Sequence, residues 1–262
     1  MVLLESAENL SLRYHNRQQL PTQIEVFTYL RDKYFPIIDK WIDIDYGFAS
    51  NSLVSNDKHS TIKNILLCVE AGRESFDFIN GSNIDLVISH HPSFVSVPHL
   101  HFHLPMDFAV RMSQNRYFAY RMGLKNVELI GDSYVVGYLP VPMTFPNLLR
   151  FLNKRGYNIK PVKRVNNNDL INSVCFVAGL GSYAFSDRLR SLGLPVLDNV
   201  RADIFITGQL FHNFLPNFDK VLEIGHTNSE KPIFRWVRHV LLNRWENLNV
   251  LLLPDELESW TG

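Results

Sequence analysis

The sequence predicts an α/β fold made of two similar halves. Short apolar runs without polar alternation, such as "NILLCVE" and "DLVISH", are separated by segments of helical character. Continuous apolar strands are typical of parallel sheets, in which both faces are covered by other parts of the chain. A strand–helix–strand arrangement of this kind occurs twice along the 262 residues. We expect the halves to span residues 1–140 and 141–262, or to be intertwined in one domain.

The first half begins with a predicted helix and continues with a strand–helix–strand unit. Residues 21–40 carry apolar side chains at helical spacing until Pro36 interrupts the pattern. Residues 62–70 and 84–90 are predicted strands, and residues 71–80 are the predicted helix between them.

The second half repeats this pattern. Residues 172–182 predict a strand followed by a glycine-rich turn, and residues 202–209 predict the next strand. When Asp85 is aligned with Asp203, "DLVISHHPSF" lies over "DIFITGQLFH". This internal similarity favours two related halves.

The remaining elements follow from turn and capping signals. Three prolines, Pro140, Pro142 and Pro146, predict a connection between the halves, with a helix after it. Ser229 is expected to cap a further helix, and "NVLLLP" predicts a closing strand. The apolar face of that helix carries Phe234, Val237, Leu241 and Trp245.

Composition limits the function classes. Lys plus Arg and Asp plus Glu are balanced at 26 each, and the pI is near 7.2. This balance disfavours nucleic-acid binding and binding to an anionic membrane. No apolar stretch reaches the roughly 18 residues of a membrane span. Cys68 and Cys175 lie in apolar runs and are expected to be buried free thiols, so we expect a cytoplasmic protein.

Two adjacent histidines, His90 and His91, follow an apolar strand directly. In open α/β sheets, ligands bind beyond the carboxyl ends of the strands, and imidazole is a common metal ligand. Neighbouring side chains on a strand point to opposite faces, so each histidine would bind a different ion of a pair about 3.5–4 Å apart. The alternative is a pair of exposed or hydrogen-bonded histidines at the end of a strand, without a metal.

His226 and Glu230 also follow an apolar strand, in "EIGHTNSE". If the turn is helical, residues four apart share a face, and both side chains can then bind one ion. The alternative is that Glu230 stabilises the first turn of a helix through the helix dipole.

Two further features have open interpretations. His99, His101 and His103 alternate, so a strand would place all three on one face, where they would bind zinc or line the rim of a site or a subunit contact. The turn that contains Gly179 and Gly181 can hold a phosphate or simply join a strand tightly to a helix.

Several of these motifs together resemble those of a known family. "DLVISHHPSF" and "EIGHTNSE" resemble the two signature motifs of the NIF-three-like family, also called the type 2 form of GTP cyclohydrolase I. "ADIFITGQ" and "VAGLGS" resemble a strand and a glycine-rich turn of that family, and the order of motifs holds over roughly residues 62–253.

The resemblance implies a fold of two α/β halves that face a central metal-binding cleft. It implies that His90, His91, His226 and Glu230 bind one or two divalent ions, either zinc, iron or manganese. It also implies a ring-like homo-oligomer, such as a hexamer, and a metal-dependent hydrolase that acts on a nucleotide-like substrate, as in the ring opening of GTP.

The sequence departs from the family at some positions. The family has an "HTxLD" stretch whose aspartate bridges the metals, and the gapless match here is "RMGLK", which puts Arg121 and Lys125 in place of the histidine and the aspartate. Gln209 replaces a glutamate. A protonated ammonium cannot bind a metal. The alternative function is therefore a catalytically degenerate metal-binding scaffold or regulatory protein with the same fold.

Overall fold

The chain forms two compact units. The computed structural model describes residues 19–36, 52–55, 57–93, 95–108, 111–131, 134–157, 159–162, 168–185, 190, 196–197, 199–211 and 216–254. The first unit combines Met1–His103 with Phe234–Ser259, and the second consists of Leu104–Ile233 with Trp260–Gly262. The chain thus returns to the first unit after the second.

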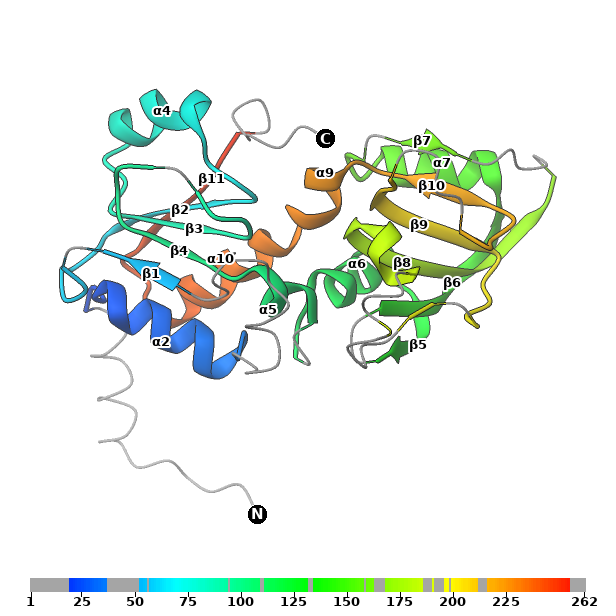
Figure 1. Ribbon diagram of the computed structural model, residues 1–262, viewed down its shortest axis with the longest axis horizontal. Coiled ribbons are helices and arrows are strands. Elements are labelled where there is room, and N and C mark those ends of the chain that lie inside the picture. Colours follow the sequence, from blue (N-terminus) through cyan, green and yellow to red (C-terminus); the bar gives the residue numbers. More distant parts are fainter. Residues whose placement is uncertain are drawn as a thin grey trace, which may run out of the picture. The chain divides into compact units, whose positions relative to one another are not determined.

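The first unit is built around a five-stranded sheet in the order β1-β4-β3-β2-β11 (Figure 1). Its strands pair in parallel, except that β1 is antiparallel to β4. The two strands predicted at residues 62–70 and 84–90 are confirmed as the parallel pair β2 and β3. In chain order, the strands are β1 (Ser52–Val54), β2 (Asn64–Cys68), β3 (Leu86–Ser89), β4 (His99–His101) and β11 (Asn249–Leu252).

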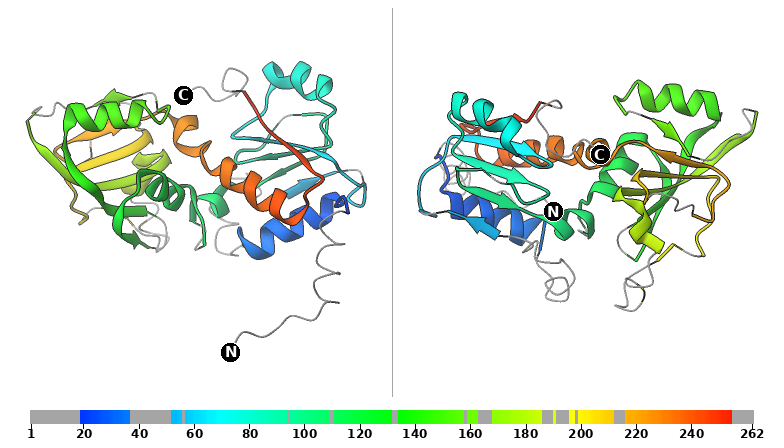
Figure 2. Two further views of the ribbon diagram at one scale, coloured as in Figure 1. Left: turned by 180° about the vertical axis from the view of Figure 1, so that it is seen from behind. Right: turned by 45° about the horizontal axis from the view of Figure 1, so that its top comes forward.

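Helices cover both faces of this sheet (Figures 1 and 2). The 3₁₀ helix η1 (Arg73–Ser75) and helix α4 (Phe76–Gly81) connect β2 to β3 on one side. On the other side lie α2 (Gln23–Lys33) and α10 (Ile233–Arg244). Tyr29 of α2 packs edge to face with Trp245, the residue that follows α10. The face predicted for α10 is confirmed, because Phe234, Val237, Leu241 and Trp245 are all buried.

The second unit contains a six-stranded sheet in the order β5-β6-β8-β9-β10-β7. The central strands β8, β9 and β10 are parallel, which confirms the second predicted pair of buried strands. The strands β5, β6 and β7 pair with their neighbours in antiparallel orientation. The strands are β5 (Lys125–Ile130), β6 (Tyr134–Thr144), β7 (Lys160–Pro161), β8 (Leu170–Leu180), β9 (Ile204–Gln209) and β10 (Val221–Glu223).

The prolines expected to mark a connection lie inside strand β6. The connection predicted at Pro140 and Pro142 is therefore wrong. Proline has no N–H group to donate to a neighbouring strand, so regular positions of a sheet exclude it. It is tolerated where the pairing of two strands is irregular. Both prolines fall where the pairing of β6 with β8 shifts register, between Tyr138 and Met143.

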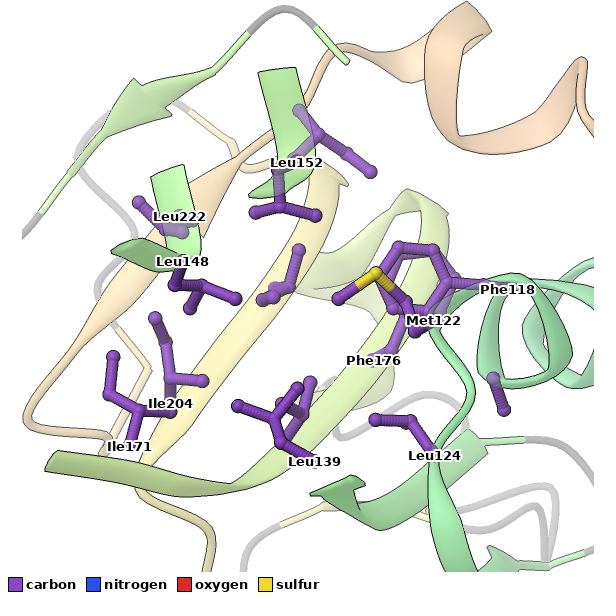
Figure 3. Packing of buried hydrophobic residues seen from close by; sticks show 14 of the residues in the cluster. Phe118, Met122, Leu124, Leu139, Leu148, Leu152, Ile171, Phe176, Ile204 and Leu222 are labelled. Carbon is purple, nitrogen blue, oxygen red and sulfur yellow. The ribbon is translucent and has the colours of Figure 1, made fainter. Parts of the chain in front are cut away.

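One face of the second sheet packs against two helices, α6 (Gln114–Met122) and α7 (Phe145–Asn153). Figure 3 shows Phe118 and Met122 of α6 and Leu148 and Leu152 of α7 directed at side chains of the sheet. Helix α7 confirms the helix predicted after the prolines, and Pro146 lies in its first turn, where the missing N–H costs no helical hydrogen bond.

Both cysteines are buried as thiols, as predicted. Burial raises the pKa of the Cys175 thiol far above its usual value, because the thiolate would be poorly solvated. Among the helices that the structure describes, none has both the length and the apolar character needed to cross a bilayer.

Candidate metal centre

His90 and His91 follow the carboxyl end of β3, as predicted. Their backbone is fixed by Val69, whose carbonyl accepts from His90 N at 3.1 Å and from His91 N at 2.8 Å. The hydroxyl of Ser89 donates to the His91 carbonyl. These contacts hold the turn that directs the two imidazoles.

The two rings have different surroundings. His90 is fully buried, and its Nδ1 lies 3.3 Å from the Phe102 carbonyl oxygen. When Nδ1 donates a proton to that carbonyl, Nε2 is the nitrogen whose electron pair can bind a metal. The side chain of His91 is 12% exposed, and its Nδ1 lies 3.8 Å from a carboxylate oxygen of Glu70. A carboxylate beside an imidazole is common around metal-binding histidines.

His103 joins these two histidines, contrary to the strand arrangement predicted for it. Strand β4 ends at His101, and His103 is the first residue of helix α5 (His103–Phe108). Its ring centre lies 4.9 Å from that of His90 and 5.2 Å from that of His91. One ring nitrogen from each of the three lies within 4.8 Å of the others, so the first unit gathers a three-imidazole cluster.

The other two histidines of that segment have different positions. His101 is buried within β4. His99 lines a cavity in the first unit together with Gln23. The prediction that His99, His101 and His103 share one face of a strand is therefore wrong, because the strand ends before the third.

In the second unit, His226 and Glu230 form a buried pair. Both lie on the short helix α9 (His226–Glu230), and His226 Nε2 is 3.1 Å from Glu230 Oε1. Their side chains are 7% and 3% exposed. The expected shared face at a spacing of four residues is confirmed. Glu230 is the last residue of α9, so it does not stabilise the first turn of that helix.

Ser229 does not cap a helix as predicted, because α9 begins at His226, after Gly225 in a left-handed conformation. The Ser229 side chain instead links α9 to the end of β8. Its hydroxyl donates to the His226 carbonyl at 2.6 Å and accepts from the Gly179 N–H at 2.8 Å. This pair of bonds fixes the helix that carries both candidate ligands.

The glycine-rich turn makes room for side chains of the candidate site. Gly179 has φ +64°, and a Cβ added there would overlap the Glu230 carboxylate. A Cβ at Gly181 would overlap the Thr207 side chain, and one at Gly208 would lie 2.5 Å from the Gly179 carbonyl oxygen. The geometry supports the close-packing interpretation of this turn.

Asp107 is a candidate ligand that the sequence interpretation missed. It lies on α5, and one of its carboxylate oxygens is within 4.8 Å of one of Glu230. Two carboxylates this close favour a shared proton or a bound cation. The signal was present in "HLPMD", because His103 and Asp107 have the same spacing as the histidine and aspartate of "HTxLD".

The residues first matched to "HTxLD" lie elsewhere. Lys125 is exposed at the start of β5, and Arg121 is in the last turn of α6. Gln209 is the last residue of β9 and is partly buried.

The donor sets fit divalent metals. Imidazole nitrogen suits zinc and iron, and carboxylate oxygen adds affinity for manganese. The space that Gly179 leaves for the Glu230 carboxylate is consistent with a carboxylate that serves as a ligand.

Comparison with protein families decides the affiliation of the chain. The family model described as Duf34/NIF3 (NGG1p interacting factor 3) matches residues 96–256. The chain belongs to the Duf34/NIF3 family. This match includes β4, α5 and α9, and thus His103, Asp107, His226 and Glu230.

Solved structures have the same fold. Reduced HcgD from Methanocaldococcus jannaschii is 16% identical with a TM-score of 0.66, over 90% of this chain and 99% of that one. TTHA1606 from Thermus thermophilus is 19% identical with a TM-score of 0.65, over 89% and 98%. A Bacillus cereus protein related to NIF3 is 12% identical with a TM-score of 0.64, over 92% and 99%.

These identities mark the chain as a divergent Duf34/NIF3 member, and they confirm the resemblance drawn from its motifs. No curated protein gives a significant match to the sequence.

Proposed function

We propose that this Duf34/NIF3 protein binds one or two divalent metal ions and hydrolyses a nucleotide-like small molecule. The proposed ligands are His90, His91, His226 and Glu230, with His103 and Asp107 in the places first assigned to Arg121 and Lys125. The observation that carries the proposal is the buried His226–Glu230 pair, whose atoms are 3.1 Å apart and whose carboxylate fills the space above Gly179.

In this proposal, each unit would supply part of the ligand set. The first unit contributes the three-imidazole cluster, and the second contributes His226 and the carboxylates of Glu230 and Asp107. The central cleft implied by the resemblance stays a prediction. If the cleft exists, both clusters bind the same ions, and altering either cluster should release them.

The chemistry follows from the donor types. A bound divalent ion supplies Lewis acidity and lowers the pKa of water. The burial of His226 and Glu230 excludes bulk solvent, which strengthens electrostatic interactions with a substrate. Ser229 orients α9, and Asp107 supplies a second carboxylate beside Glu230, able to accept a proton.

Metal analysis of protein purified without chelator tests the binding step. We expect one or two equivalents of zinc, iron or manganese, and less than half an equivalent in repeated preparations would refute the proposal. Glu230→Gln and His90→Ala should each lower the metal content. His239→Asn is the matched control, since His239 is exposed on α10 and contacts Asn243.

The hydrolytic step has a separate test. The metal-loaded protein is incubated with GTP and other nucleotides, and the loss of substrate is followed by chromatography. Turnover that disappears in Glu230→Gln supports the hydrolase. Full metal content without turnover of any nucleotide favours the second candidate, a metal-binding scaffold or regulatory protein, which Gln209 in place of a glutamate also favours.

The homo-oligomer, such as a hexameric ring, and the cytoplasmic location also stay proposals that rest on the resemblance and the composition. Light scattering coupled to gel filtration tests the first, and a monomer at micromolar concentration would contradict it.

A further inference from the structure

A second candidate site lies in the first unit, in a cavity of about 270 Å³. Its walls come from the start of α2, the loop after β1 and the segment before β4. The residues that line it are Gln23, Val54, Ser55, Asp57, Ser60, Val95, Ser96, Val97, Pro98 and His99. The cavity includes none of the candidate metal ligands.

Gln23 is a buried amide in the wall of this cavity. It is the first residue of α2, and the residue is 3% exposed. Within the described residues, its Oε1 accepts no hydrogen bond. A buried polar atom without a partner is costly, and a ligand that donates a hydrogen bond removes the cost.

The walls are held in place by backbone and side-chain hydrogen bonds. Gln23 N donates to the Ser60 carbonyl at 3.2 Å, and Ile24 N donates to the Lys58 carbonyl at 2.9 Å. Asp57 accepts from the Ser60 hydroxyl at 2.6 Å and from the His59 N–H at 3.0 Å. The loop after β1 is therefore fixed to the start of α2.

The chemistry of the lining limits the ligand. The polar groups of the lining are a carboxylate, an amide, three serine hydroxyls and an imidazole, and neither lysine nor arginine is among the lining residues. Burial lowers the pKa of His99 and so disfavours the charged form of its imidazole. A phosphate group is disfavoured, and a ligand with N–H donors is favoured.

The shape and size of the cavity narrow the class of ligand further. Val54, Val95, Val97 and Pro98 provide apolar surface, which suits the flat face of a ring. The volume lies just under the range of about 300–1,000 Å³ that is usual for sites of drug-sized ligands. We propose that this cavity binds a single heterocyclic base with an exocyclic amino group, such as adenine in adenosine, with the amino group donating to Gln23 Oε1.

Titration of the full-length protein with adenosine and with inosine tests the ligand class, because inosine replaces the amino group with an oxo group. We expect adenosine to bind at least about tenfold more tightly, since an unsatisfied acceptor then remains with inosine. Equal affinities, or no binding of adenosine at millimolar concentration, would overturn the proposal. Binding of methylammonium in place of adenosine would also overturn it.

Gln23→Met tests the residue. We expect adenosine affinity to fall by about five- to tenfold. The matched control is Gln114→Met, because Gln114 is also a buried first residue of a capped helix, α6, outside this cavity. Unchanged affinity in Gln23→Met contradicts the assignment, as does an equal loss in the control.

One measurement leaves the cavity itself unaltered and separates this site from the metal centre. Nuclear magnetic resonance of the wild-type protein should show adenosine-induced shifts at the Gln23 side-chain amide and the His99 ring. The shifts should persist in Glu230→Gln. Shifts confined to His226 and its neighbours, or lost in Glu230→Gln, would place the nucleoside at the metal centre and overturn the proposal.

Discussion

Asp85 and Asp203 make the same pair of hydrogen bonds in the two units. Asp85 Oδ2 accepts from the backbone N–H groups of Lys63 and Asn64, both at 2.8 Å. Asp203 Oδ2 accepts from those of Asn172 and Ser173, also at 2.8 Å. Each aspartate directly precedes one strand of a parallel pair and receives hydrogen bonds from the other. The alignment of Asp85 with Asp203, which suggested two related halves, therefore corresponds to the same hydrogen-bond arrangement in both units.

Asp203 should make stability depend on pH. Partial burial disfavours its charge, but hydrogen bonds from Ser173 and Asn172 and the Lys220 charge hold the pKa of its carboxyl below its usual value. The stabilisation is present above the unfolded-state pKa, about 4, and is lost as pH falls through the folded-state pKa. Asp203→Asn should lower the free energy of unfolding at pH 7 by about 1 kcal/mol, with a smaller difference below pH 4.

Urea unfolding of wild type and Asp203→Asn between pH 3 and pH 7 checks this prediction. Asp219→Asn is the control, since Asp219 is exposed and lies outside the sheet. A difference that stays constant over this pH range would show that the charge of Asp203 is not responsible.

Gly179→Ala should damage the candidate metal centre through a steric effect. A left-handed conformation costs a residue with a Cβ about 1–2 kcal/mol, and here the Cβ would also displace the Glu230 carboxylate. Gly156→Ala is the matched control, because Gly156 has φ +84° with no atom within 4 Å of an added Cβ. Both variants should unfold at lower temperature, but only Gly179→Ala should also lose metal. Equal metal content in the two would argue against Glu230 as a ligand.

Asp107→Asn should reduce metal content, because it removes a negative charge within 4.8 Å of Glu230. Mass spectrometry of the metals in purified protein measures the effect, and Asp77→Asn on the exposed surface of α4 serves as control. Full metal content in Asp107→Asn would exclude Asp107 from the ligand set.

Lys125→Asp should leave the metal content unchanged, because Lys125 is exposed on β5 and Asp107 supplies the carboxylate. The same metal analysis applies. A rise in metal content would restore the view that Lys125 stands in for a lost aspartate and that the site is degenerate.

Cys175 should react with thiol reagents only after unfolding. It is fully buried and its pKa is raised, so little thiolate is formed or reached. The rate of reaction with a chromogenic disulfide, with and without urea, measures this. Rapid labelling of Cys175 in the native protein, identified by peptide mass, would contradict the burial of β8.

Sequence patterns correctly predicted the features that depend only on residues close together in the chain. His226 and Glu230 are four residues apart, so helical geometry alone brings them together. His103 and Asp107 were missed because the gapless match to "HTxLD" was placed at Arg121–Lys125, which begins in the last turn of α6, whereas α5 carries the same spacing earlier in the chain. The prolines of β6 were misassigned, because a register shift with β8 is set by the partner strand.

The return of the chain has a consequence for its synthesis. Strand β11 pairs with β2, and Asn249 and Asn64 share a side-chain hydrogen bond across 185 residues of sequence. On the ribosome, all strands of the second sheet are therefore synthesised before the first sheet receives its last strand. Until β11 is synthesised, the edge of β2 that pairs with it stays exposed, and exposed strand edges favour aggregation. We therefore expect chaperones to bind the early strands of the first unit during translation, because their sheet is completed only when β11 emerges.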